Sequence, residues 1–480
     1  MVRNIPQTSS GKLELVKGLG AWAAMAMVVG HIIGTGVFLV PTSMANATNS
    51  VGLIFLVWVV GGALSLAGAL TVAELGAAMP EAGGAYIYLK RGFGPTWGFL
   101  FGWMNNLVGK PASISTIAAG FLIFVSFFFE WVMNPIFTLH IPLPFAEKPY
   151  EFVFRWAQPM AALAIAFVTF INYLGVRLAG RLQVVLTCIK VGAILAVVVL
   201  GFLLAGERAP SETPLFPASM HLGLLAGFLT AMVGALWAYD GWIDLTFAGS
   251  EVQEPQKNIP RAVVGGTVTV GIIYLLANAV YFHVLPIEAV KATSNVATAT
   301  VRAFAGDNAA AWITAAMVIS GFTTLNSSIL TGARVPYAMA RDKLFFSIAD
   351  GIHPKFRTPA GALFFQGTVA SAMVLTVQFE DLFSLFIFAQ WIFYALTVAS
   401  IFGLRKREPD LPRPYRALGY PIVPMIFVLG ATALTVNLYI QRPIRSTIGL
   451  ALILSGLPFY RYWQQKTRGV ADMKSASTGT

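Results

Sequence analysis

Long apolar runs alternate with short polar segments along almost the whole chain. Twelve of these runs are each close to the roughly 20 residues that an α-helix needs to cross a bilayer, and some are long enough to tilt. They cover residues 18–46, 51–78, 95–129, 157–175, 180–205, 221–250, 261–285, 309–340, 360–379, 382–404, 418–440 and 446–464. The pattern predicts an all-α polytopic membrane protein with 12 transmembrane helices.

Two of the runs are interrupted at their centres by residues that favour a break in a helix. The first run contains Gly34-Thr35-Gly36, and the sixth contains Ala238-Tyr239-Asp240-Gly241. Interrupted segments at matching places in two halves of a chain are a sequence indication of a transport site. We therefore expect helices 1 and 6 to be broken around a shared site.

The spacing of the two breaks also predicts how the chain is organised. Five runs separate equivalent positions, and because five is odd the second copy would be inverted in the membrane. The expected units of one transporter domain, 1–480, are a first repeat at 18–205, a second inverted repeat at 221–404 and two further helices at 418–464.

Composition supports a membrane protein, because only 11% of the residues are charged and 57% are hydrophobic. Soluble domains carry about 25% charged residues. The net charge of +11 is unevenly distributed: with the N-terminus inside, 23 Lys and Arg residues fall in inner segments and 7 in outer ones. This bias predicts an inner or plasma membrane protein with both termini cytoplasmic, and it argues against nucleic-acid binding. The polar N-terminal residues lack the apolar core of a signal peptide, so we expect no cleavage there.

Cys188 is the single cysteine of the sequence, and it lies within an apolar run. An intramolecular disulfide is therefore impossible, and a cysteine-based metal cluster is not expected. We expect no cofactor, no metal site and no partner chain attached through a disulfide.

Lys190 lies near the middle of the fifth run. A lysine at the centre of a spanning helix costs roughly 2.5–3.5 kcal/mol on insertion scales. It lies about ten residues, some 15 Å, from the start of the run, too deep for its side chain to reach water readily. We expect it to act as a built-in cation that holds carbonyl oxygens of the broken first helix and a hydroxyl such as Ser327 or Ser328. It could also carry a coupled proton.

The two breaks together suit a zwitterion. Amide groups at the start of the second half of helix 1 would bind a carboxylate, and free carbonyl oxygens in the sixth run would accept from an ammonium group. Trp237, just before the second break, is placed to close over a ligand. Asp240 could bind the ammonium group or a proton, or could cap the second half of helix 6.

Other polar residues within the runs leave more than one interpretation open. His31 is either a buried core histidine or a direct participant. Lys110 and Glu74 favour roles in structure, topology or gating. Gln390 could line the pocket or bond a neighbouring helix.

Several motifs resemble the amino acid–polyamine–organocation superfamily. They are His31-Ile32-Ile33-Gly34-Thr35-Gly36-Val37-Phe38, Pro80-Glu81-Ala82-Gly83-Gly84-Ala85-Tyr86, Trp237-Ala238-Tyr239-Asp240-Gly241-Trp242 and Tyr337-Ala338-Met339-Ala340-Arg341-Asp342. With Lys190 and Lys110-Pro111, the sequence is most similar to the L-type amino acid transporter family, particularly its bacterial members. The resemblance implies an inverted-repeat fold and sodium-independent amino acid transport by alternating access, often as exchange.

The resemblance also implies roles for individual residues. The substrate carboxylate would bind the amides of Thr35 and Gly36, next to Gly34. The amine would bind the carbonyls of Ile32, Trp237 and Asp240, next to Ala238. Trp237 stands where the family has a phenylalanine gate, Lys190 replaces a sodium ion, and Tyr274 matches a position linked to function. Eukaryotic members use an external cysteine to join a heavy chain, and this sequence has none.

The sequence therefore predicts a transporter that exchanges neutral L-amino acids without sodium, with a free amino acid as substrate and the bilayer as its surroundings. The alternative is a proton-coupled amino acid or polyamine symporter of the same fold. A channel would not need broken helices. An enzyme is not expected, because no pairing of serine with histidine, metal cluster or catalytic carboxylate pair lies at spanning depth.

Overall fold

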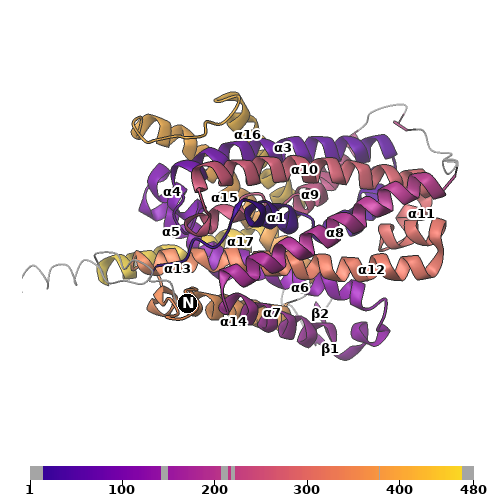
Figure 1. Ribbon diagram of the computed structural model, residues 1–480, viewed down its shortest axis with the longest axis horizontal. Helices are drawn as coiled ribbons and strands as arrows, with labels where there is room; N and C mark the ends of the chain where they lie inside the picture. Colours follow the sequence, from indigo (N-terminus) through magenta and orange to yellow (C-terminus); the bar gives the residue numbers. More distant parts are fainter. Residues whose placement is uncertain (1–13, 142–149, 207–214, 218–221, 378, 467–480) are drawn as a thin grey trace, which may run out of the picture.

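The computed structural model describes residues 14–141, 150–206, 215–217, 222–377 and 379–466, and these residues form a bundle of long helices (Figure 1). The helices of the first half are α1 (Ala21–Ile32), α2 (Gly36–Thr48), α3 (Val51–Ala78), α4 (Ala85–Phe93), α5 (Pro95–Met104), α6 (Lys110–Val125), α7 (Ala157–Tyr173) and α8 (Val176–Leu204). Those of the second half are α9 (Leu222–Ala238), α10 (Pro255–Val284), α11 (Ile287–Ala292), α12 (Val296–Gly332), α13 (Arg334–Arg341), α14 (Ala360–Thr376), α15 (Phe379–Arg407), α16 (Ile422–Gln441) and α17 (Pro443–Leu454).

The helices correspond closely to the predicted runs. Within the described residues, eight helical segments are long and apolar enough to cross a membrane, and three shorter apolar helices accompany them. The twelfth predicted run, 446–464, coincides with α17 and a continuing helix at 456–466. The expectation of a polytopic helical membrane protein is therefore confirmed, whereas the count of 12 spans stays a prediction.

Two helices begin earlier than their apolar runs. The run at 261–285 belongs to α10, which starts at Pro255, a residue that fits the first position of a helix because its missing N–H has no helical partner there. The run at 309–340 lies within α12, which starts at Val296 but changes direction at Gly306, where φ is 79°. Hydropathy detects the apolar part of a helix, and polar turns extend beyond it.

The segment at 130–156, between the third and fourth predicted runs, contains strands that the apolar pattern did not predict. A short 3-10 helix, η2 (Glu130–Met133), precedes β1 (Pro135–Ile141), which pairs antiparallel with β2 (Tyr150–Arg155). Phe137 and Phe154 stack across this hairpin with ring centroids 4.9 Å apart. The hairpin connects α6 to α7 and is a small addition to a mostly helical fold.

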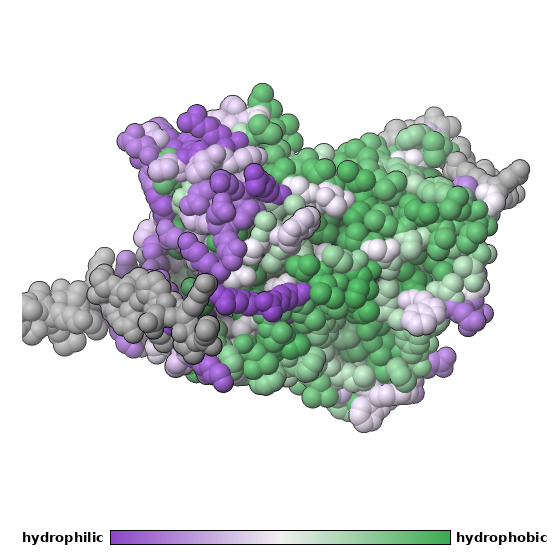
Figure 2. Space-filling view, in the orientation of Figure 1, coloured by the Kyte–Doolittle hydropathy of each residue, from purple (hydrophilic) through white to green (hydrophobic). Residues whose placement is uncertain are grey.

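Hydrophilic residues gather at the end of the molecule that carries α4 and α13, whereas apolar residues cover most of the remaining visible surface (Figure 2). Ion pairs join the elements at this hydrophilic end. Glu74 of α3 accepts from Arg405 at 2.6 Å and from the backbone amide of Ala417 at 2.6 Å. Lys90 and the Tyr86 hydroxyl both donate to Asp342 at 2.6 Å. Burial and the Asp342 carboxylate raise the pKa of Tyr86, so its hydroxyl keeps the donated proton.

The third membrane segment contains an irregular turn that positions a lysine. Between α5 and α6 the chain forms one π-helical turn, η1 (Asn105–Gly109). Pro111, two residues after this turn, has no N–H to donate to a carbonyl of the preceding turn. Its position therefore favours a local widening of the helix. Lys110 thus starts α6 with its side chain buried.

Candidate functional site

Both predicted breaks are present at the centre of the bundle. Helix α1 ends at Ile32 and α2 begins at Gly36, and the helical hydrogen-bond pattern is lost at Gly34, whose amide donates to Ile32 O at 2.8 Å instead of to Gly30 O. Helix α9 ends at Ala238, and Gly241 follows with φ of +113°, a conformation that glycine adopts without strain. A Cβ atom at Gly36 would lie 2.8 Å from the Cβ of Ala238, so the two breaks touch where residue 36 has no side chain.

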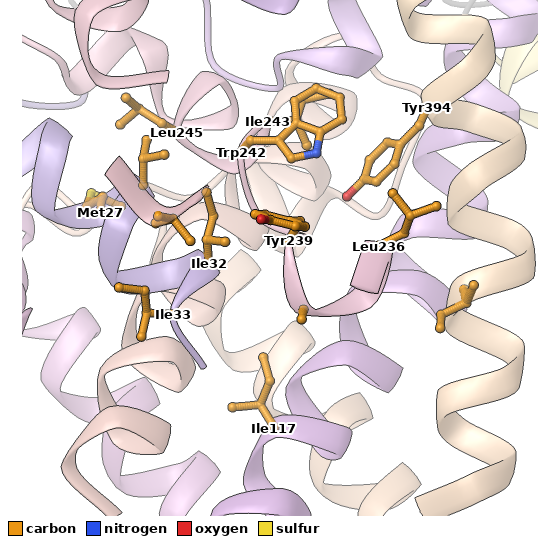
Figure 3. Close-up of a cluster of buried hydrophobic side chains, with 14 of the residues drawn as sticks. Met27, Ile32, Ile33, Ile117, Leu236, Tyr239, Trp242, Ile243, Leu245 and Tyr394 are labelled. Atoms are coloured by element: carbon orange, nitrogen blue, oxygen red, sulfur yellow. The ribbon is translucent and has the colours of Figure 1, made fainter. Parts of the chain in front are cut away.

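The sixth segment continues differently from the sequence prediction. We expected a second helical half that Asp240 could cap, but the chain forms two short 3-10 turns, η3 (Asp244–Phe247) and η4 (Gly249–Glu251). No side chain caps the start of η3. The Asp240 carboxylate instead accepts a hydrogen bond from the Tyr394 hydroxyl of α15 at 2.6 Å. Tyr394 points its hydroxyl toward the turn that carries Tyr239 and Trp242 (Figure 3).

A small cavity of about 30 Å³ lies between the two breaks. All seven residues expected to bind substrate line it, namely Ile32, Gly34, Thr35, Gly36, Trp237, Ala238 and Asp240. Three further lining residues, Ser113, Ile117 and Thr324, were not predicted, because small polar or apolar residues within a long apolar run carry no distinctive signal. The volume is about that of one water molecule, so the site is contracted in this conformation.

Lys190 of α8 binds the backbone of the first break, as predicted. Its Nζ donates to the carbonyl oxygens of Gly30 at 2.6 Å and Ile33 at 2.5 Å, and the residue is only 1% exposed. The Gly30 carbonyl has lost its regular helical partner because the Gly34 amide donates to Ile32 O at 2.8 Å, and Ile33 lies between the two helices. The ammonium group thus stabilises the unwound segment of helix 1.

The hydroxyls around Lys190 differ from those expected. Ser320 donates to Ile33 O at 3.1 Å and Thr324 donates to Gly30 O at 3.1 Å. Ser327 instead donates to Met27 O at 3.3 Å, and the Ser328 hydroxyl has no hydrogen-bond partner among the described residues. Ser327 is three residues beyond Thr324, about 4.5 Å further along α12, and therefore lies level with an earlier turn of α1.

Tyr274 of α10 connects the two breaks directly. Its hydroxyl lies 2.8 Å from the carbonyl oxygen of Ile32 and 2.9 Å from that of Ala238. The family resemblance assigns the Ile32 carbonyl to a substrate ammonium, and Ala238 directly follows Trp237, whose carbonyl has the same expected role. Gln390 does not line the cavity: its Oε1 lies 3.1 Å from where a Cβ of Gly109 would be, against η1.

A buried polar cluster next to the cavity was not predicted as a unit. Asp244 of η3 accepts from Lys110 of α6, lies 3.2 Å from His31 Nε2 of α1, and accepts from the Thr331 hydroxyl of α12 at 3.4 Å. Lys110 and His31 were noted individually in the sequence. Asp244 lies beyond the break motif and had no local signal, and only the fold brings the four residues together.

A larger cavity of about 430 Å³ lies on the other side of Trp237. Its walls come from α2, α9, α15, α16 and α17, and its lining includes Arg442 and Arg445. Trp237 lines this cavity and the small one. The tryptophan therefore separates a wide vestibule from the contracted central site.

A helical bundle with two helices unwound around a buried polar cavity is the architecture of a membrane carrier. Sequence comparison agrees, because the model of the amino acid permease family matches residues 19–457, which is nearly the whole chain. The chain belongs to the amino acid permease family.

Individual relatives are similar over almost their full lengths. The serine/threonine exchanger SteT of Bacillus subtilis (strain 168) is 31% identical over 93% of this chain and 96% of its own. The human b(0,+)-type amino acid transporter 1 is 31% identical over 95% of this chain and 88% of its own. The human large neutral amino acids transporter small subunit 2 is 32% identical over 97% of this chain and 84% of its own.

Proposed function

We propose that this protein is a sodium-independent transporter that exchanges neutral L-amino acids across the membrane by alternating access. The observation that carries the proposal is the Lys190 ammonium group bound to the Gly30 and Ile33 carbonyl oxygens at 2.6 and 2.5 Å. Backbone carbonyls in an unwound membrane helix are typical ligands for a coupling ion. A lysine in that position supplies the positive charge permanently, so no sodium ion is needed.

The proposed substrate site lies between the two breaks. The amides of Thr35 and Gly36 would bind the carboxylate, and the carbonyls of Ile32, Trp237 and Asp240 would receive the ammonium group beside the Tyr274 hydroxyl. Exchange of amino acids fits the names of similar proteins, which include an exchanger of serine and threonine. The two inverted repeats at 18–205 and 221–404, the 12 spans and the cytoplasmic termini are part of this proposal.

The proposal includes a carrier that works without a disulfide-linked heavy chain. Cys188 is the single cysteine and lies exposed on α8, an apolar membrane helix. A thiol at that depth faces lipid and cannot reach an extracellular partner. Non-covalent association is not affected by this argument.

Counterflow in proteoliposomes tests the function. Vesicles loaded with unlabelled serine should accumulate labelled serine, and vesicles without internal amino acid should take up much less. The same assay with an imposed pH gradient distinguishes exchange from proton-coupled symport. Accumulation driven by the gradient in vesicles that contain no amino acid would favour the symporter instead.

Exchange should be unaffected by sodium. Initial counterflow rates in sodium chloride and in choline chloride at equal ionic strength should agree, because Lys190 already occupies the carbonyl site. A stimulation of several-fold by sodium in the wild-type protein would contradict the built-in cation.

Recognition should depend on both charged groups of the amino acid backbone. The cavity is lined by the backbone of two unwound segments, so a methyl ester or an N-acetyl derivative loses one of the two ionic contacts. Hydrogen bonds to charged groups contribute about 1.5–3 kcal/mol, so each derivative should compete at least about tenfold more weakly than the free amino acid. Equal competition by the ester and the free acid would exclude this geometry.

A further inference from the structure

We propose that His31, Lys110, Asp244 and Thr331 form an inner latch that closes the cytoplasmic side of the substrate site and must open for release of substrate to the cytoplasm. The inference rests on the proposed alternating-access function. It assigns a positioning role to Asp244, which contacts the other three members of the cluster.

The contacts of the latch join the two interrupted segments, which can move, to the helices α6 and α12, which are not interrupted at the site. His31 lies in the last turn of α1, next to the first break, and Asp244 begins the 3-10 turn that follows the second break, so movement at these points needs few helical bonds to break. Lys110 and Thr331 belong to α6 and α12, which pack against each other along the bundle. Separation of the two groups of elements must therefore break the bonds at Asp244.

The latch lies inward of the cavity on the two continuous helices. In the predicted topology with a cytoplasmic N-terminus, segment 3 runs outward from Pro95, and Lys110 precedes the cavity residue Ser113 by three positions. Segment 8 runs inward, and Thr331 follows the cavity residue Thr324 by seven positions, about 10 Å along the helix. Both helices run in opposite directions, yet both place their latch residue on the same side of the site.

The two interrupted segments give the same result. In segment 1, which runs outward in the predicted topology, His31 lines the inner end of the cavity and precedes the unwound residues 33–35. In segment 6, which runs inward, Asp244 follows the cavity residue Asp240 by four positions. Each of the four elements thus places its latch residue on the inner side of the site, which these residues close. The wide vestibule lies on the outer side of Trp237.

Burial strengthens the ion pair between Lys110 and Asp244 in the latch. The side chains of Lys110 and Asp244 are 7% and 4% exposed, so their attraction is weakly screened by water. A buried pair that loses one partner leaves an uncompensated charge, which opposes separation until water or substrate enters. His31 Nε2 lies 3.2 Å from the same carboxylate, and its Nδ1 has no hydrogen-bond partner among the described residues.

Thiol labelling from the cytoplasmic side tests the latch. In a Cys188→Ser background, Ser328→Cys places a reporter on α12 between Thr324 and Thr331, where Ser328 is fully buried and its hydroxyl has no partner. Inside-out vesicles are treated with a membrane-impermeant maleimide. The double variant Lys110→Met/Asp244→Asn removes both charges together, and its reporter should react roughly three- to tenfold faster because the inward-open population rises.

A matched control uses an ion pair that does not join different elements. Glu254 and Lys257 pair at 3.0 Å within one exposed turn at the start of α10. Their neutral double variant, Glu254→Gln/Lys257→Met, should leave the labelling rate of the reporter unchanged. An equal increase in this control and in the latch variant would overturn the proposal.

A second variant keeps the test decisive if the double variant is not inserted. His31→Ala leaves the ion pair intact and removes one contact to Asp244, so it should accelerate labelling by an intermediate factor. If the reporter thiol is labelled at an unchanged rate in either correctly inserted variant, the cluster has only a structural role. Failure of the wild-type protein to catalyse any counterflow would instead overturn the proposed function, whatever the labelling rates are.

Discussion

Replacement of Lys190 by alanine is expected to abolish most amino acid exchange while the protein still inserts into the membrane. The change removes two charge-assisted hydrogen bonds to Gly30 O and Ile33 O. Bonds of this kind contribute about 1.5–3 kcal/mol each, so the two together amount to about 3–6 kcal/mol, and because every 1.36 kcal/mol corresponds to a tenfold change in rate, a loss of at least about a hundredfold is expected. Counterflow at matched membrane expression measures the effect.

Two controls separate this effect from a general loss of charge. Lys257 is 67% exposed at its side chain, and Lys257→Ala should retain normal exchange. The Lys190→Ala variant should also be measured in sodium and in choline, because the vacated carbonyl oxygens are hard ligands that suit an alkali cation. Normal exchange by Lys190→Ala in choline would show that the ammonium group has no role in transport.

Replacement of Trp237 by alanine should remove most exchange, whereas Trp237→Phe should keep a substantial part of it. The side chain separates the central cavity of about 30 Å³ from the vestibule of about 430 Å³, and a phenyl ring would still cover the ligand. An alanine would join the two spaces and admit water to the site. Exchange rates and the range of accepted side chains, measured with a panel of amino acids, report the change.

Trp312 provides the matched control for the tryptophan variants. It is 80% exposed on α12, far from a cavity-lining position, and Trp312→Ala should leave exchange and selectivity unchanged. Near-normal exchange and affinity in Trp237→Ala at matched expression would show that this side chain only packs. If every variant accepts the same amino acids, the Trp237 side chain does not line the pocket.

The sequence predicted those parts of the site that depend on strong local signals. It is energetically unfavourable to place a pair of glycines or a lysine in the middle of a spanning run unless a specific structure compensates for them. Both breaks and the Lys190 contacts lie where they were expected. The long apolar runs likewise predicted the helices, because helical backbone bonding is obligatory in lipid.

The parts that were missed depend on register between elements distant in sequence. Ser320 and Thr324 rather than Ser327 and Ser328 reach the Lys190 carbonyls, a difference of about one turn of α12 that no local pattern determines. The contact of Asp244 with Lys110 joins residues 134 positions apart. The 3-10 turns after Asp240 replaced an expected helix because tertiary contacts outweighed helix propensity there.

The Tyr274 hydroxyl has a single proton but two carbonyl neighbours, Ile32 O at 2.8 Å and Ala238 O at 2.9 Å. It can donate to one of them at a time. The Ile32 oxygen also accepts from the Gly34 amide at 2.8 Å, so the tyrosine proton is the one available to the Ala238 oxygen. An arriving ammonium group carries three protons and can satisfy both oxygens and the tyrosine oxygen together. Binding of substrate at this point therefore exchanges the tyrosine donor for the ammonium group, and the hydroxyl that is released can accept from the substrate, so recognition is an exchange of hydrogen bonds rather than the filling of a space.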